Sequence, residues 1–405
     1  MAILAQLGYG KGHKVENGFM NHIINGVVLR PQNDKPDSLI EYAENIKNTC
    51  KNIDVYFDPQ FNIFSIRGDV NYGKIELYPF YPNTTVQGRN YLLSELIGYI
   101  DGSINFQKKL GVNSIISLSP IIDSFQDREM GTLSNIVELS LDKLRNNNSD
   151  SQLSQNYSSS NFIVSICISE SAFNNMDTVS AALDEITSWD VEGFYITIVR
   201  DLSNNGYEPY IKENTLAYIL YFLYVLSVIN NYKIIIGYTN LLAIPLSVAC
   251  NADFAVGWFG KTQMFTSAGF LATTGGQPAK LRYLSQKLLS SLLVDPETKI
   301  IRQKIGDQIY LSGSPFDKQL INEQWTAKES FLEDWYVLSK LTSEIQAEEK
   351  VEKRISILNS KINAAKELFS EIKSVMPELD KKSNPRYLNL WESALSEFER
   401  ILSES

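Results

Sequence analysis

Short apolar runs alternate with amphipathic stretches along the chain as far as Lys261. The pattern is plainest from Tyr232 onward, where apolar runs at 233–237 and 253–256 enclose a short amphipathic segment. Strands that alternate with helical segments at this spacing are typical of parallel strands joined by crossovers. This stretch therefore predicts one β-α-β unit, and the rest of the chain can be compared with it.

Runs of the length of a buried strand recur before this unit as well. The predicted strands lie at 2–7, 26–29, 53–57, 114–118, 162–168, 193–199, 233–237 and 253–256. The stretches between them predict helices, among them 37–51, 92–110, 132–145 and a strongly apolar helix at 216–229. Strands and helices in this number and order predict a (β/α)8 barrel, the TIM-type α/β fold. An open, doubly wound sheet is the alternative, because the number of strands does not prove closure.

The pattern changes after the barrel. Apolar residues then recur at alternating steps of four and three on a highly charged segment, as in a heptad seam. They are Val351, Ile355, Leu358, Ile362, Ala365, Phe369, Ile372 and Met376. A second helix follows around Trp391. We therefore expect a barrel at 1–293 and an α-helical region at 294–405. The seam predicts either helices packed on each other or on the barrel, or an element that makes the protein a homodimer.

Composition narrows the classes of function. The net charge of -10 excludes a protein that is basic over its whole surface, although a local basic patch is compatible with it. Two histidines and three scattered cysteines show no spacing typical of a zinc site, so we expect no metal and no cofactor. The apolar run at 216–229 is too short to span a membrane, and the N-terminus does not resemble a signal peptide. We therefore expect a cytoplasmic protein.

A run of Ser, Asn, Gln and Asp at 146–161 predicts a surface insertion.

Polar side chains follow the predicted strands. Because the active site of a (β/α)8 barrel lies at the carboxyl ends of its strands, these side chains are expected to meet at one mouth. The candidate catalytic residues are Asp58, Asp123 and Asp201. The candidate substrate-binding residues are Lys11, Arg30, Gln60, Arg200, Tyr238, Asn240, Trp258 and Lys261. Carboxylates could act as a general base or stabilise an oxocarbenium-like centre, cations could hold phosphates, and aromatic rings could stack on a base.

Several strand ends resemble those of the tRNA-guanine transglycosylase superfamily of barrels. The segment 55–65, VYFDPQFNIFS, is similar to the end of the family's third strand, and this places Asp58 at the family's base-handling aspartate. The segments 110–123 and 236–256 are similar to its fourth strand and to its seventh and eighth strands. The resemblance covers about residues 1–290. It implies a barrel that acts on the glycosidic bond of a nucleobase, with DNA or RNA as the partner.

The sequence also departs from the family's pattern. Val256 stands where the family has a nucleophilic aspartate, the cysteine-rich zinc site is absent, and 194–198 replaces a glycine-rich strand that contacts guanine. The resemblance then implies an acidic pocket that cleaves the glycosidic bond with water. The family includes DNA-acting relatives used in base modification and in bacterial defence against phage.

Two other functions fit the same residues. A carbohydrate-directed hydrolase would use two carboxylates at the mouth. A barrel without catalysis would act as a binding module, and its C-terminal helices would recruit a partner. The missing nucleophile favours the latter.

Overall fold

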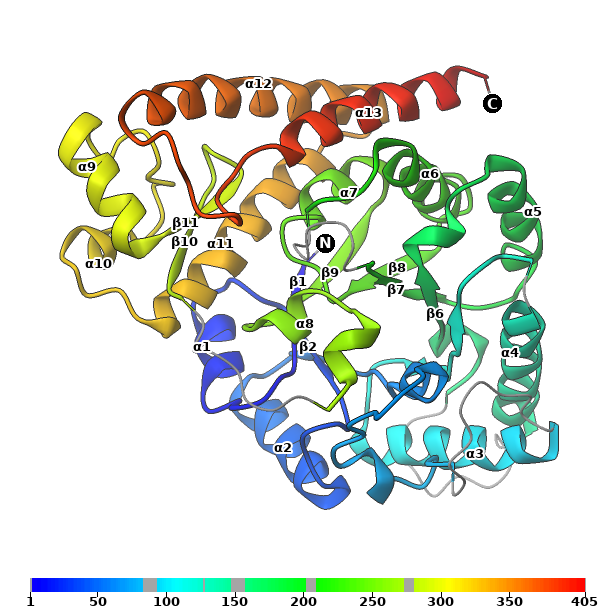
Figure 1. Ribbon diagram of the computed structural model, residues 1–405. Coiled ribbons are helices and arrows are strands. Elements are labelled where there is room, and N and C mark those ends of the chain that lie inside the picture. The colour runs from blue at the N-terminus through cyan, green and yellow to red at the C-terminus, as the bar shows by residue number, and fades with distance from the viewer. Residues whose placement is uncertain are drawn as a thin grey trace.

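The computed structural model describes residues 2–82, 93–126, 128–146, 157–201, 209–272 and 280–404. In this part of the chain, parallel strands form a nearly closed barrel with helices around it, and the C-terminal helices lie against the barrel (Figure 1). The predicted (β/α)8 barrel with a helical extension is therefore confirmed. The insertion predicted at 146–161 lies largely outside the described residues.

The barrel strands follow one another around the barrel in chain order. They are β1 (Ile3–Gln6), β2 (Gly26–Leu29), β3 (Asp54–Phe57), β4 (Ile115–Ile116), β5 (Ile121–Ile122), β6 (Phe162–Ser169), β7 (Gly193–Val199), β8 (Lys233–Gly237) and β9 (Ala252–Val256). The fourth predicted strand is divided into β4 and β5, which both pair with β6. β9 pairs with β1, and this pairing joins the last strand to the first. At the other edge of the sheet, the N–H of Asn113, just before β4, donates to the Val55 carbonyl of β3 at 2.9 Å.

Helices follow most of the strands, as the amphipathic stretches predict. They are α1 (Lys14–Met20), α2 (Pro36–Thr49), α3 (Leu93–Leu110), α4 (Arg128–Asn146), α5 (Met176–Ile186), α6 (Glu213–Tyr224), α7 (Ala243–Ala249) and α8 (Gly260–Gln263). The strongly apolar stretch forms α6 and a π-helical turn, Val225–Ile229. A helix that is apolar on most sides needs cover on both faces. α6 obtains this cover from the barrel and from a C-terminal helix.

The C-terminal region contains more structure than its sequence pattern predicted. An antiparallel hairpin, β10 (Arg282–Ser285) and β11 (Ser290–Leu293), precedes α9 (Lys299–Ile305) and α10 (Asp317–Ile321). The long helices α11 (Ala327–Gln346), α12 (Val351–Val375) and α13 (Tyr387–Glu404) follow. α11 lies against α7 and the hairpin, and α13 lies along α6. These helices therefore form a second layer outside the barrel helices.

The heptad seam is buried inside this layer. Its first seven residues, on α12, are at most 5% exposed, and Met376 beyond the helix is half-buried. α12 contacts α7, α9, α11 and α13 of the same chain. The interpretation that the seam packs on the chain's own helices is therefore confirmed. A homodimer would have to use another face of these helices.

Three side chains anchor the outer layer to the barrel by hydrogen bonds. The Trp335 Nε1–H donates to the Val256 carbonyl at 3.0 Å, and the Gln346 amide donates to the Cys250 carbonyl at 2.9 Å. The Trp391 Nε1–H donates to the Pro209 carbonyl at 3.1 Å. Buried carbonyls that helices and strands leave unpaired thus obtain donors from α11 and α13.

Glu333 of α11 provides a test of this packing. Its side chain is fully buried, and the loss of hydration raises its pKa to about 8, with the charge of Asp317 acting in the same direction. Because the folded-state pKa lies above the ordinary value of 4.5, stability is lost as the pH rises from that value through about 8. We predict that Glu333→Gln stabilises the fold by on the order of 3 kcal/mol near pH 8 and has little effect near pH 4. Thermal unfolding across this pH range measures the difference.

The exposed Glu371→Gln on α12 is the matched control, and it is expected to change the melting temperature little at any pH. A Glu333→Gln effect that is the same at both ends of the pH range would contradict the prediction.

Candidate functional site

Three polar side chains lie inside the barrel at the carboxyl ends of β1, β2 and β3. The barrel interior is filled by an apolar layer of eight residues: Leu4, Val28, Tyr56, Ile116, Ile163, Tyr195, Ile235 and Ala255. Alternate residues of a strand point to the same side, so the residues two positions after Leu4, Val28 and Tyr56 also point inward. These residues are Gln6, Arg30 and Asp58. Gln6, Arg30 and Asp58 are at most 1% exposed. Burying such groups is costly unless they are paired, so their partners decide what this layer does.

Asp58 is held by hydrogen bonds from two sides of the barrel. The Tyr238 hydroxyl, beyond β8, donates to Oδ2 at 2.7 Å, and the Gln60 backbone N–H donates to Oδ1 at 2.9 Å. The Gln60 amide in turn donates to the Tyr238 hydroxyl at 3.0 Å. Gln60 and Tyr238 both adopt positive φ angles, 53° and 55°. Left-handed backbone is uncommon in residues other than glycine, and here it lets Gln60 and Tyr238 both reach Asp58.

Burial determines the protonation of this cluster. It raises the pKa of Asp58, and the Tyr238 and Gln60 hydrogen bonds and the charge of Arg30 oppose that rise in part. Burial and the charge of Asp58 also raise the pKa of Tyr195 and of Tyr238 well above the usual range, so both remain hydroxyl donors. A carboxyl group that keeps its proton to higher pH than usual is suited to general acid catalysis as well as to base catalysis.

Tyr195 of β7 links the two layers, because its ring belongs to the apolar layer and its hydroxyl donates to the Gln6 side-chain oxygen at 3.1 Å. A Cβ atom on Gly237 would lie 2.2 Å from this hydroxyl, so a glycine is required at the end of β8 for Tyr195 to reach Gln6. We call the buried set Gln6, Arg30, Asp58, Tyr195 and Tyr238 the polar layer.

A second buried group follows β6 and β7 and is fully paired. The Arg200 Nε–H donates to Glu170 Oε2 at 2.6 Å, and an Nη2–H donates to the Tyr210 carbonyl at 2.5 Å. The other Glu170 oxygen accepts the Asp201 backbone N–H at 2.9 Å. Arg200 is therefore neutralised by Glu170, and this ion pair fixes the loop after β7.

The other two predicted catalytic acids lie outside the polar layer. Asp123 and Asp201 are exposed, and Asp123 accepts a hydrogen bond from the Ser169 hydroxyl. Burial raises the pKa of the Cys167 thiol, and the charges of Asp58 and Asp123 add to that rise. Of the three acids, Asp58 is the one inside the barrel, and the other two lie around the mouth.

The predicted substrate-binding residues divide in the same way. Arg30 and Tyr238 belong to the polar layer, Gln60 contacts it, Arg200 belongs to the paired group, and Asn240 is half-buried beyond β8. The remaining three lie at the rim with Tyr9 and Lys14. We call this set the basic–aromatic rim: Tyr9, Lys11, Lys14, Trp258 and Lys261.

Contacts within the basic–aromatic rim link the loops after β1 and β9. The Trp258 Nε1–H donates to the Tyr9 carbonyl at 2.9 Å, and Lys14 Nζ lies 5.4 Å from the centre of a Trp258 ring. Lys11 forms an ion pair with Asp34 at 2.6 Å, whereas Lys261 is exposed. The Tyr9 side chain is 79% exposed.

The segment 257–272 covers the mouth, and we call it the mouth lid. The Phe265 ring packs edge-on against Tyr238 at 5.1 Å, and the Phe265 carbonyl accepts the Arg200 backbone N–H at 2.9 Å. Beyond it, the Phe270 carbonyl accepts the Asn71 N–H at 2.8 Å. In Figure 1, α8 of this segment lies in front of the barrel strands. The polar layer is therefore closed from above, and a large ligand would have to displace the mouth lid.

Val256 and Asp253 lie at opposite ends of the last barrel strand, β9. The last residue of β9 is Val256, which is fully buried, so this strand end carries no carboxylate. Asp253 lies at the other end of the barrel, where Oδ1 accepts the Ala2 backbone N–H at 2.7 Å. Neither residue contributes a nucleophile to the polar layer.

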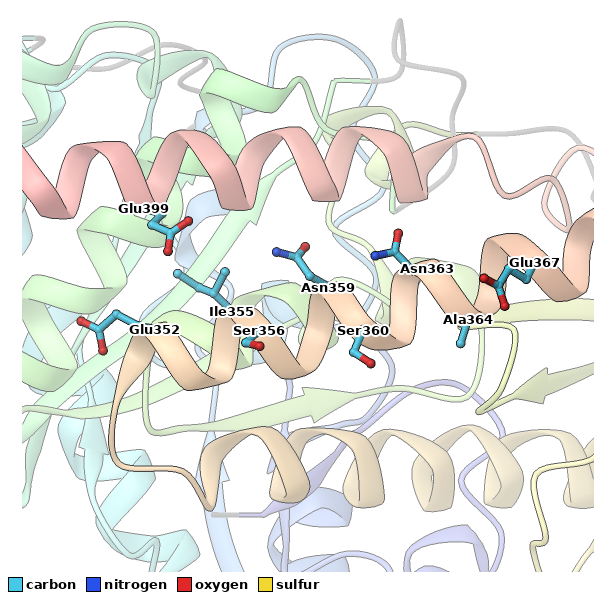
Figure 2. Close-up of a pocket in the computed structure, with 9 residues that line it drawn as sticks. All are labelled: Glu352, Ile355, Ser356, Asn359, Ser360, Asn363, Ala364, Glu367 and Glu399. Carbon is cyan, nitrogen blue, oxygen red and sulfur yellow. The ribbon is translucent and has the colours of Figure 1, made fainter.

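A separate groove of about 670 Å³ lies along α12 (Figure 2). Asn359 and Asn363 point from α12 toward α13, and Glu399 points back from α13. No residue of the barrel mouth lines this groove. Its polar lining residues are glutamates, asparagines and serines that are exposed or half-buried, so the buried polar layer remains the candidate site.

Two further classes of site have no candidates among the described residues. No group of three or more His, Cys, Asp or Glu residues there is arranged to hold a metal ion. None of the described helices combines the length and the apolar character needed to cross a membrane.

Gln6 and Tyr195 belong to the site but were not among the predicted residues. Gln6 lies in β1 and Tyr195 in β7, whereas the residues predicted from the sequence all follow predicted strands. A polar side chain at an inward-facing position within a strand is the signal that identifies them.

The bond between Tyr238 and Asp58 gives a prediction. We expect Tyr238→Phe to lower the free energy of unfolding by about 1–3 kcal/mol at a pH where Asp58 is ionised, because the buried carboxylate then loses a donor. The lost hydrogen bond had lowered the Asp58 pKa, so that pKa rises further above its ordinary value. The penalty is therefore smallest at low pH, where Asp58 is protonated, and grows as the pH rises through the pKa of Asp58. Urea unfolding at several pH values measures it.

Tyr283→Phe is the matched control, because the Tyr283 hydroxyl donates to Asp317 at the same distance of 2.7 Å in the C-terminal region. This variant is expected to destabilise the protein without changing the titration of Asp58. A Tyr238→Phe penalty that does not vary with pH would contradict the prediction.

Comparisons with known proteins add no assignment to this geometry. No family model matches the chain, and no curated protein matches it.

Proposed function

We propose that this barrel is an enzyme that cleaves the glycosidic bond of a nucleobase in DNA or RNA, with Asp58 as the group that transfers the proton. The observation that carries the proposal is the buried Asp58 carboxyl at the carboxyl end of β3, bonded to Tyr238 and with a raised pKa. The resemblance of the segment 55–65 to the transglycosylase superfamily points to the same residue.

The chemistry would be hydrolysis. Protonated Asp58 donates its proton to the departing base as the bond between C1′ and the base nitrogen breaks. A water molecule then adds to C1′ and loses a proton to the Asp58 carboxylate, which restores the acid. The products are a free base and an abasic sugar. Water is the nucleophile in this scheme because the carboxyl end of β9 carries buried Val256 and no carboxylate.

The basic–aromatic rim supports nucleic acid as the substrate. The chain as a whole is acidic, with a net charge of -10, so contact with phosphates requires local positive charge. Lys14 supplies such charge beside the Trp258 ring, and Lys261 follows three residues later in the chain. The rings of Tyr9 and Trp258 are suited to stacking on bases. A base would have to leave its stack to reach Asp58 inside the barrel, as in other enzymes that act on bases.

One observation favours a second candidate, a barrel that binds a ligand without catalysis. The mouth lid covers the polar layer, and Phe265 at its centre is fully buried. A binding module would retain such a closed pocket without a need for turnover. The two-carboxylate hydrolase is less well supported, because the polar layer contains one carboxyl group, that of Asp58.

Asp58→Asn tests the proposal. The change preserves shape and removes the acid, so base release is expected to fall at least about 100-fold while the protein remains folded. Single-stranded DNA and RNA oligonucleotides containing all common bases are incubated with the protein, and free bases are measured by mass spectrometry.

Asp54→Asn, on the same strand but at the opposite end of the barrel, is the control and is expected to keep its activity. Base release by Asp58→Asn at the wild-type rate would exclude Asp58 as the catalytic group. A folded wild-type protein that binds oligonucleotides but releases no base would favour the binding module.

A further inference from the structure

Arg30 is a buried cation whose hydrogen-bonding capacity is largely unused. It is 1% exposed, and its Nε and Nη1 have no hydrogen-bond partner among the described residues. Its Nη2 lies 3.0 Å from the Asn33 side-chain oxygen when that amide is oriented to accept. A guanidinium group carries five N–H donors, so Arg30 brings a positive charge and the three N–H donors of its Nε and Nη1 into the barrel, close to the Tyr238 hydroxyl, whose pKa Arg30 lowers.

Asp58 does not neutralise this charge by direct contact. The charge of Arg30 lowers the pKa of Asp58, but the two side chains form no ion pair in the described part of the chain. Both Asp58 oxygens are engaged by other donors, Tyr238 and the Gln60 N–H. Arg200 provides the contrast within the same barrel mouth, because Glu170 satisfies it at 2.6 Å.

Gln6 supplies a second unused donor in the same layer. Its side-chain oxygen accepts from Tyr195, while its Nε2 has no partner among the described residues, and the residue is fully buried. β1 and β2 pair in parallel with Gln6 opposite Val28, so Gln6 and Arg30 occupy neighbouring inward positions. A buried donor without an acceptor lowers the free energy of unfolding, and Gln6 and Arg30 both have such donors.

We propose that the polar layer binds a small oxyanion, a phosphate or a carboxylate, whose oxygen atoms accept hydrogen bonds from Arg30 and Gln6. The anion supplies a negative charge in direct contact with Arg30 and the acceptor that Gln6 lacks. Guanidinium groups bind both kinds of oxyanion through charge-assisted hydrogen bonds. The proposal deepens the proposed function by giving its site an anionic substrate group, yet it is tested by binding alone, so either can fail without the other.

The mouth lid encloses this site. Phe259, which precedes α8, places its ring 5.8 Å from the Arg30 guanidinium carbon. A Cβ atom on Gly8 would lie 2.2 Å from that ring, so the glycine after β1 allows Phe259 to take this position. Phe259 therefore limits the access of water to Arg30, which strengthens the attraction between Arg30 and a bound anion.

The test measures the melting temperature of the full chain with and without added anion. Inorganic phosphate and acetate, each at millimolar concentration, are compared with chloride at equal ionic strength. At least one of the two is expected to raise the melting temperature by several degrees, because a ligand that binds the folded state stabilises it. The active anion distinguishes a phosphate site from a carboxylate site.

Two variants assign the effect to this layer. Arg30→Met removes the buried charge, so the anion-free protein is expected to melt at or above the wild-type temperature and to show no anion effect. Gln6→Glu places an internal carboxylate beside Arg30 and is expected to give the same two results. Arg145→Met, on the exposed end of α4, is the control and should keep the wild-type response.

Three outcomes would overturn the proposal. They are no stabilisation of the wild type by either anion, an undiminished response in folded Arg30→Met or Gln6→Glu, and a lower anion-free melting temperature in both variants. The last would show that Arg30 and Gln6 stabilise the empty barrel. If Arg30→Met does not fold, the wild type and Gln6→Glu still decide the question.

Discussion

The hydrogen bond between the Tyr238 hydroxyl and Asp58 is the contact on which the candidate site depends. It joins the ends of β8 and β3, which are separated by three intervening strands of the barrel. The bond can form only because the sheet closes, so that strands distant in the sheet face each other across its interior. It keeps a carboxyl group buried where the barrel would otherwise be filled by apolar side chains.

The apolar layer and the polar layer lie at different heights in the same barrel. The apolar layer from Leu4 to Ala255 fills the interior below, and the helices α11 to α13 bury a further layer outside. These parts supply hydrophobic stabilisation. The polar layer above them contains a carboxyl with a raised pKa, a tyrosine with left-handed backbone (Tyr238) and donors without acceptors. Features that oppose folding and persist at one place are typical of a site selected for binding or catalysis.

The two buried arginines at the mouth differ in their partners and not in their burial. Arg200 has Glu170 and a carbonyl as acceptors, and it fixes the loop after β7. Arg30 is equally buried but has unused donors. From the sequence the two are alike, since each follows a strand. Only the contacts made by each guanidinium assign Arg200 to the scaffold and Arg30 to the site.

The sequence by itself determined the elements, because strand and helix periodicities are local. It gave the eight strand positions, the mouth as the place for Asp58, Arg30 and Tyr238, and the long seam on α12. It did not predict the hairpin β10–β11 or α11. The tertiary structure alone decided which mouth residues meet: Asp58 with Tyr238, 180 positions apart, and Tyr195 with Gln6, 189 apart. It also left Asp123 and Asp201 at the rim. Such pairings depend on closure of the barrel and on side-chain reach, which no local pattern of hydrophobic and polar residues encodes.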